Sequence, residues 1–108
     1  MADPAAIADI MNRMWEKFLP DIGDRVRVLE NAAEALAQGS ISAELRAEAF
    51  SAAHKLAGTL GTFGLEEGTV LAREAEAFYS TDASVTASNG RPAIIASRLR
   101  TMLAARGK

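Results

Sequence analysis

Apolar residues in this chain of 108 residues recur every three or four positions, and this spacing constrains its fold more than any other feature. The clearest example lies between residues 21 and 38, where the spacings are four, three, four and three: Ile22, Val26, Leu29, Ala33 and Leu36. Because an α-helix turns about 100° per residue, side chains at such spacings share one face. Clusters of β-branched residues with period-two alternation are absent. The sequence therefore predicts an all-α protein.

Five helical segments are expected, over about residues 4–19, 21–38, 42–62, 65–80 and 92–106. Pro20 is expected to end or bend the first segment, because the residue before a proline avoids the α region. Asp21 then caps the second segment, and Gly39 stops it. The run from 81 to 90, rich in turn-forming residues, is the clearest loop.

Long amphipathic helices joined by short connections favour antiparallel neighbours. We therefore expect an antiparallel up-down four-helix bundle, with residues 4–19 as an additional N-terminal helix that caps or extends it. Neither a repeat nor a second hydrophobic pattern divides the chain, so residues 1–108 are expected to form a single domain.

The composition excludes several classes of function. The chain has no cysteine and one histidine, which rules out disulfides and makes a zinc site unexpected, so we predict neither a metal nor a cofactor. The net charge is −2 and no basic face is visible, so a nucleic-acid partner is not expected. Basic residues gather only near the C-terminus, where the helix dipole favours them, although they could also form a small patch: Arg98, Arg100, Arg106 and Lys108.

No apolar run approaches the roughly 18 residues that a membrane span needs. The first residues include Asp3 and Pro4 and lack a basic region, which is not typical of a signal peptide. We therefore expect a cytoplasmic protein, a monomer with no membrane contact.

The single histidine, His54, lies in the middle of the segment 42–62. On a helix it faces away from the apolar stripe of that segment, which consists of Leu45, Ala49, Ala52, Leu56, Leu60 and Phe63. Gly58 and Gly61 share its face within roughly 40°, although each glycine costs a helix about 1 kcal/mol relative to alanine. Two explanations remain open: a bulky partner approaches the imidazole closely, or another helix of the same bundle packs tightly against the glycines.

These residues resemble the histidine-containing phosphotransfer (HPt) domains of two-component phosphorelays, whose helix carries the pattern His-x-x-Lys-Gly. The match consists of His54, Gly58 and Gly61, followed by Thr62-Phe63-Gly64. The run from Gly61 to Gly64 is especially similar to the phosphotransfer domains of chemotaxis-type histidine kinases. The approach segment Phe18-Leu19-Pro20-Asp21 is also similar to the family.

The resemblance implies that His54 accepts a phosphoryl group and exchanges it with aspartates of response-regulator receiver domains, in a pathway fed by a sensor histidine kinase. It also implies a docking surface around the histidine, formed by Phe50, Ala57, Gly58 and Gly61. Glu76, on the next helix, matches an acidic residue that hydrogen-bonds the imidazole in chemotaxis-type domains. The alternative is that Glu76 forms a surface ion pair with Arg73 or Lys55, which would contribute little.

One position departs from the family pattern, because Ala57 stands where the lysine is expected. That lysine would steady phosphoryl oxygens and favour an acidic partner. Lys55 is next to the histidine but about 100° around the helix from it. It either reaches the phosphoryl group by its long stem or is an ordinary solvated side chain.

The expected chemistry is that of a covalent phosphoryl carrier and not of an enzyme, because the chain has no glycine-rich loop to cradle a nucleotide. Magnesium and most charge stabilisation would come from the partner. The main alternative is a docking module that is never phosphorylated, which the alanine at position 57 favours. A histidine-dependent hydrolase is not expected, since a convex helix face offers no oxyanion site.

Overall fold

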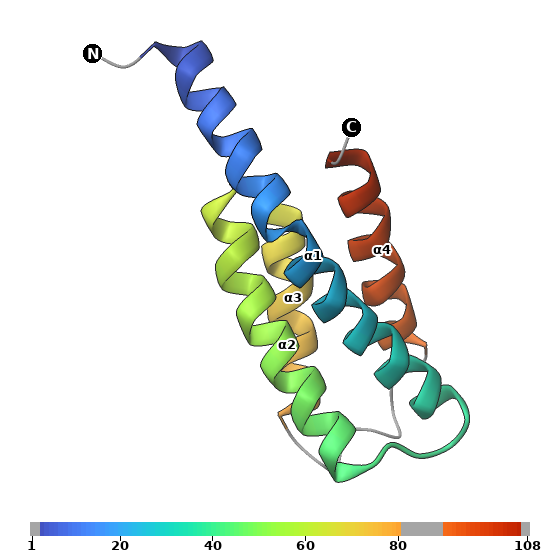
Figure 1. Ribbon diagram of the computed structural model, residues 1–108. Coiled ribbons are helices and arrows are strands. Elements are labelled where there is room, and N and C mark those ends of the chain that lie inside the picture. Colours follow the sequence, from blue (N-terminus) through green and yellow to red (C-terminus); the bar gives the residue numbers. More distant parts are fainter. Residues whose placement is uncertain (1–2, 81–89, 107–108) are drawn as a thin grey trace.

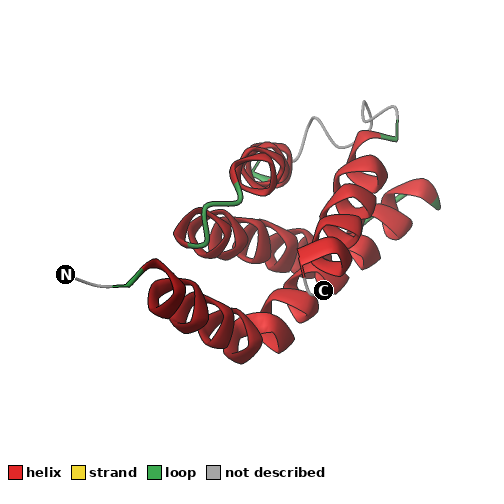
Figure 2. Cartoon of the chain, turned by 90° about the horizontal axis from the view of Figure 1, so that it is seen from above, coloured by secondary structure: helices red, strands yellow, loops and turns green. Residues whose placement is uncertain are grey.

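The computed structural model describes residues 3–80 and 90–106, and this part of the chain contains four α-helices and no strand. The helices are α1 (Pro4–Ala37), α2 (Ala43–Thr62), α3 (Glu66–Tyr79) and α4 (Arg91–Arg106). Figure 1 shows them running alternately down and up, and Figure 2 shows only helices and loops among the described residues. The all-α prediction is confirmed. The predicted loop at 81–90 lies almost entirely outside the described residues.

Each helix packs against two neighbours, because α1 and α3 both contact α2 and α4. The bundle is elongated, measuring 53 × 21 × 21 Å, and the N-terminal part of α1 projects beyond the other helices (Figure 1). Ile7, Ile10 and Met14 are therefore exposed, although their spacings of three and four residues place them on one helix face.

The prediction of a separate N-terminal helix is wrong, because α1 continues through Pro20 as one helix of 34 residues. A proline inside a helix removes one backbone hydrogen bond and crowds the preceding turn, at a cost of about 3 kcal/mol. Here the ring faces solvent, while Trp15 and Ile22 on either side of it are buried in the core. Burial on both sides of the proline compensates for the lost bond, so Asp21 lies inside the helix and does not begin one.

The ends of α1 and α2 are fixed by the same motif. Gly39 and Gly64 have positive φ angles of 114° and 73°, which favour glycine. After α2, the N–H of Gly64 donates to the carbonyl of Gly61, and the N–H of Leu65 donates to that of Leu60. This is the Schellman arrangement, and the same pair of bonds follows α1. The predicted stop at Gly39 is confirmed.

Aromatic packing holds the C-terminal end of α2 against α1. The ring of Phe63 lies edge-on to Trp15, with the ring centroids 5.2 Å apart, and also contacts Phe18. Part of the sequence run after the histidine is therefore structural: Phe63 anchors the end of α2, and Gly64 turns the chain towards α3. Gly58 and Gly61, which lie on the histidine face, need a different explanation.

Candidate functional site

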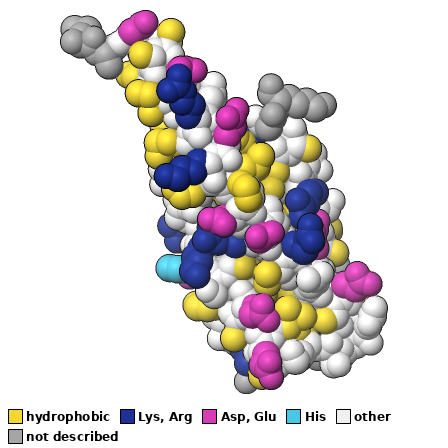
Figure 3. Space-filling model, viewed as in Figure 1, with side chains coloured by type: hydrophobic (Ala, Val, Ile, Leu, Met, Phe, Trp, Pro, Cys, Tyr) yellow, Lys and Arg dark blue, Asp and Glu magenta, His cyan; other side chains and the backbone are white. Residues whose placement is uncertain are grey.

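His54 lies on α2 with its side chain 68% exposed, and it is held from one side. Its Nδ1 is 2.8 Å from Oε2 of Glu76 on α3, whose side chain is 22% exposed. Figure 3 shows the imidazole standing out at the edge of the molecule. One ring nitrogen is thus engaged by the protein, while the exposed part of the ring faces solvent.

A second contact shows how α2 and α3 are aligned. A Cβ atom at Gly61 would lie 3.6 Å from Oγ1 of Thr69. Gly61 lies seven residues after His54, and Thr69 lies seven residues before Glu76, so the two contacts are two helical turns apart on both helices. The antiparallel pair therefore keeps one register along the whole site. Thr69 is not among the predicted site residues, although its seven-residue spacing from Glu76 places both on one flank of α3.

The surface ion pairs considered as an alternative for Glu76 are not formed. Among the described residues, Glu76 pairs with His54, whereas Lys55 and Arg73 are exposed and pair with none of them. The predicted contact of Glu76 with the imidazole is present, and its role in the chemistry remains a prediction.

The glycines on the histidine face are not required by packing within the described molecule. A Cβ atom at Gly58 would meet nothing within 4 Å, and the contact at Gly61 is an ordinary van der Waals distance. Tight packing of another helix of the bundle therefore does not explain them. The other explanation, close approach of a partner to the imidazole, stays a prediction.

The predicted docking surface needs one correction. Phe50 is exposed on α2 and lines a shallow hollow with Arg46, Ala47, Tyr79 and Ser80, so it can contribute to such a surface. Ala57, in contrast, is only 2% exposed and belongs to the hydrophobic core. The prediction failed because α3 packs along this side of α2, which makes the buried face of α2 wider than its predicted stripe.

Of the four basic residues near the C-terminus, Arg100 and Arg106 contact other helices, Arg98 is exposed, and Lys108 lies outside the described residues. Arg100 makes two hydrogen bonds to Glu30 of α1, and these hold the pKa of that carboxyl below its usual range. The guanidinium of Arg106 lies 5.0 Å from the ring centroid of Trp15 and also bonds Asn12. For Arg100 and Arg106, these contacts favour a role in helix packing over a role in a basic patch.

Neither a metal site nor a membrane span emerges from the described part of the chain. It contains no group of three or more histidine, cysteine, aspartate or glutamate side chains that could hold a metal ion. None of its helices is both long and apolar enough to cross a membrane.

Comparison with known families decides the relationship of the chain. The model of the Hpt domain family matches residues 13–107. The chain belongs to the Hpt domain family. Hpt domains carry phosphoryl groups in two-component phosphorelays and interact there with kinases and response regulators. The match begins inside α1, so the first two turns of that helix lie before the matched region. Searches of curated proteins and of solved structures gave no significant match.

Proposed function

We propose that this Hpt domain is a phosphorelay intermediate in which His54 accepts a phosphoryl group from one receiver aspartate and donates it to another. The observation that carries the proposal is the contact between Nδ1 of an exposed imidazole and the Glu76 carboxylate. A carboxylate accepts hydrogen bonds, so this contact favours the tautomer with the proton on Nδ1. The lone pair of Nε2 is then available to an incoming group.

The transfer balances without moving a proton. The Nε2 lone pair attacks the phosphorus of a receiver aspartyl phosphate, a nitrogen–phosphorus bond forms, and the phosphorus–oxygen bond breaks with its electrons left on the receiver carboxylate. The ring becomes a phosphorylated imidazolium that keeps its Nδ1 proton. Glu76 balances this positive charge, since the carboxylate and the ring share a hydrogen bond. The second transfer is the reverse of the first.

The partner supplies what the described residues do not hold. Stabilisation of a phosphoryl group in transfer needs cations and oriented donors, and a receiver domain brings these to the helix face. Gly58 and Gly61 leave room for this approach beside the imidazole, and Phe50 contributes apolar contact one turn away. The domain then acts as a monomeric cytoplasmic carrier of the chemotaxis-kinase type, with no nucleotide chemistry of its own.

Incubation with a phosphorylated receiver tests the proposal. Wild-type protein should acquire an acid-labile, base-stable label, and His54→Gln should acquire none. The substitution should leave the fold intact, because changes of exposed side chains usually alter the free energy of unfolding by less than about 0.5 kcal/mol. The matched control is Lys55→Gln, which changes the neighbouring exposed side chain and should still be labelled. Equal labelling of His54→Gln would overturn the proposal.

A second function is supported by Ala57, because α2 presents no cation at that position. The domain would then bind a receiver without accepting phosphate. This alternative predicts a complex with the receiver, seen for example by calorimetry, together with no label on the wild-type protein.

A further inference from the structure

Besides Lys55 on α2, the helix α3 carries a cation, Arg73, and the register of the two helices gives its position relative to His54. His54 lies opposite Glu76, and Gly61 lies opposite Thr69. Each step forward on α2 therefore corresponds to one step back on α3. Three steps from the first contact, Ala57 lies at the same level as Arg73.

Arg73 also lies on the correct flank of α3. It follows Thr69 by four residues and precedes Glu76 by three, and residues at these spacings share one helix face. Since Thr69 and Glu76 both face α2, Arg73 lies on the same flank of α3. Its side chain is exposed and has no hydrogen bond or ion pair with any described residue. On α2, Gly58 adds open space beside the imidazole, because a Cβ atom there would meet nothing within 4 Å.

Lys55 lies on the flank of α2 that faces away from α3. Taking His54 as the origin, Gly61 lies about 20° and Ala57 about 60° around α2 on the side of α3, whereas Lys55 lies about 100° away on the other side. The imidazole leans towards α3 through its bond to Glu76. Nε2 lies across the ring from this bond, so a group on it can be reached from α3 only by a long side chain, and arginine has one.

We propose that Arg73 supplies from α3 the cation that binds the phosphoryl oxygens on His54, in place of a cation at position 57 of α2. This proposal rests on the proposed phosphorylation of His54. Arginine suits the task because its planar guanidinium can bind two phosphoryl oxygens at once. Glu76 binds Nδ1 of the ring while Arg73 binds the group on Nε2, so two residues of one helix serve the two sides of the imidazole.

The first experiment needs no receiver. His54 is phosphorylated chemically with phosphoramidate, and the phosphoryl group is titrated by ³¹P NMR in wild type, Arg73→Gln and Arg73→Lys. A nearby cation favours the dianion, so Arg73→Gln should move the titration midpoint to higher pH and Arg73→Lys should largely restore it. Arg98→Gln on α4 is the matched control, since it removes the same charge from an exposed site away from α2. An unchanged midpoint in Arg73→Gln, or an equal shift in Arg98→Gln or Lys55→Gln, would overturn the proposal.

The second experiment measures single-turnover transfer from a phosphorylated receiver at increasing concentrations of the domain. Arg73→Gln should lower the maximal rate by about tenfold, because the lost contact acts on the transferred group. A change confined to the half-saturating concentration would mean that Arg73 only docks the receiver, and it would overturn the phosphoryl contact. If no receiver labels the wild type, the proposed function fails, while the NMR titration still decides the role of Arg73.

Discussion

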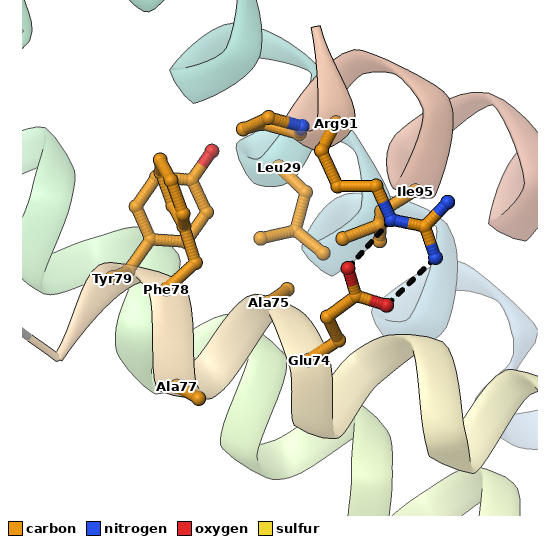
Figure 4. Close-up of a pocket in the computed structure, with 9 residues that line it drawn as sticks. Leu29, Glu74, Ala75, Ala77, Phe78, Tyr79, Arg91 and Ile95 are labelled. Atoms are coloured by element: carbon orange, nitrogen blue, oxygen red, sulfur yellow. Dashed lines mark hydrogen bonds and ion pairs between the residues drawn. The ribbon is translucent and has the colours of Figure 1, made fainter. Parts of the chain in front are cut away.

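Glu74 and Glu76 lie two residues apart on α3, face different neighbours, and use the same carboxylate chemistry to different ends. Glu74 accepts two hydrogen bonds from Arg91 of α4, at 2.5 and 2.7 Å (Figure 4). Glu76 makes one contact of 2.8 Å, with His54 of α2. Successive residues of a helix differ by about 100°, so a spacing of two sends the carboxylates to opposite flanks.

The two pairs differ in what is left unused. The guanidinium of Arg91 is a permanent cation that holds the pKa of Glu74 below its usual range, and both carboxylate oxygens are engaged. This pair joins α3 to α4 at the edge of an apolar pocket of about 380 Å³, next to Tyr79, whose burial raises its pKa to about 12. The imidazole, in contrast, has a second nitrogen that its carboxylate does not bind. The Glu76–His54 pair leaves one ring nitrogen unbound and so is suited to chemistry, whereas the Glu74–Arg91 pair uses both carboxylate oxygens and is suited to packing.

Gly58 and Gly68 differ in the space around them, as the two carboxylates differ in their partners. Gly58 on α2 faces open solvent. Gly68 on α3 is buried, and a Cβ atom there would lie 2.4 Å from Met102 and 2.9 Å from Leu60. The second glycine is explained by its neighbours within the chain, and the first is not.

The largest effect is expected when the two carboxylates are truncated in turn. Glu76→Ala should slow transfer by at least about tenfold, because the imidazole loses the partner that selects its tautomer and balances its charge. Glu74→Ala should leave transfer within about twofold of wild type, since a charge on the far flank of α3 does not contact the ring. The measurement is single-turnover transfer from one receiver at fixed ionic strength, with both variants checked by thermal unfolding.

Imidazole ¹⁵N spectra sharpen this test. Wild type should show mainly the tautomer with the proton on Nδ1, and Glu76→Ala should show a mixture. Equal rates for the two alanine variants would break the comparison, and so would an unchanged tautomer in Glu76→Ala.

The same substitution at the two glycines should have opposite effects on stability. Gly68→Gln should lower the free energy of unfolding by about 1–3 kcal/mol, because it overpacks the contact with Met102 and Leu60. Gly58→Gln should leave stability unchanged or raise it by up to about 1 kcal/mol, since glycine is the poorer helix former. It should nevertheless slow transfer, because the new side chain keeps a receiver from the imidazole. Denaturant unfolding and transfer rates check both expectations, and native-rate transfer by Gly58→Gln would show that close approach is not why glycine stands there.

The sequence predicted elements best where periodicity and a backbone requirement agreed. Gly39 combines the end of an apolar pattern with a left-handed conformation, so its role as a stop could be predicted. Pro20 could not be judged from its local effect, because burial of Trp15 and Ile22 on either side decides that the helix continues. The burial of these two side chains is a tertiary contribution to stability, which the local helix propensity of the segment does not include.

The sequence predicted individual residues of the site but not how α2 and α3 are aligned. His54 and Glu76 could be paired by their similarity to the family, but a single helix does not reveal which of its flanks the next helix will cover. Ala57 was therefore placed on the surface, although α3 buries it. Arg73 was considered only as a competitor for Glu76, because its position opposite residue 57 depends on the alignment of α2 with α3.

The smallest expected effect concerns the acid side of the stability profile. Arg91 lowers the pKa of Glu74 chiefly through their side-chain hydrogen bonds, so the folded state holds the ionised carboxylate more firmly than the unfolded state does. The resulting stabilisation is present above the ordinary carboxyl range and is lost as the pH falls through the lowered pKa. Glu74→Gln should therefore reduce stability near neutral pH and flatten its decline between about pH 5 and 3. The effect is small because both side chains are about 40% exposed, where solvent screens the pair.

Denaturant unfolding across this pH range measures the effect, with Glu48→Gln as the matched loss of one exposed carboxylate. A decline as steep in Glu74→Gln as in wild type would show that the Glu74–Arg91 pair holds α3 and α4 together by geometry alone, and its contrast with the Glu76–His54 pair would then rest on the unbound nitrogen.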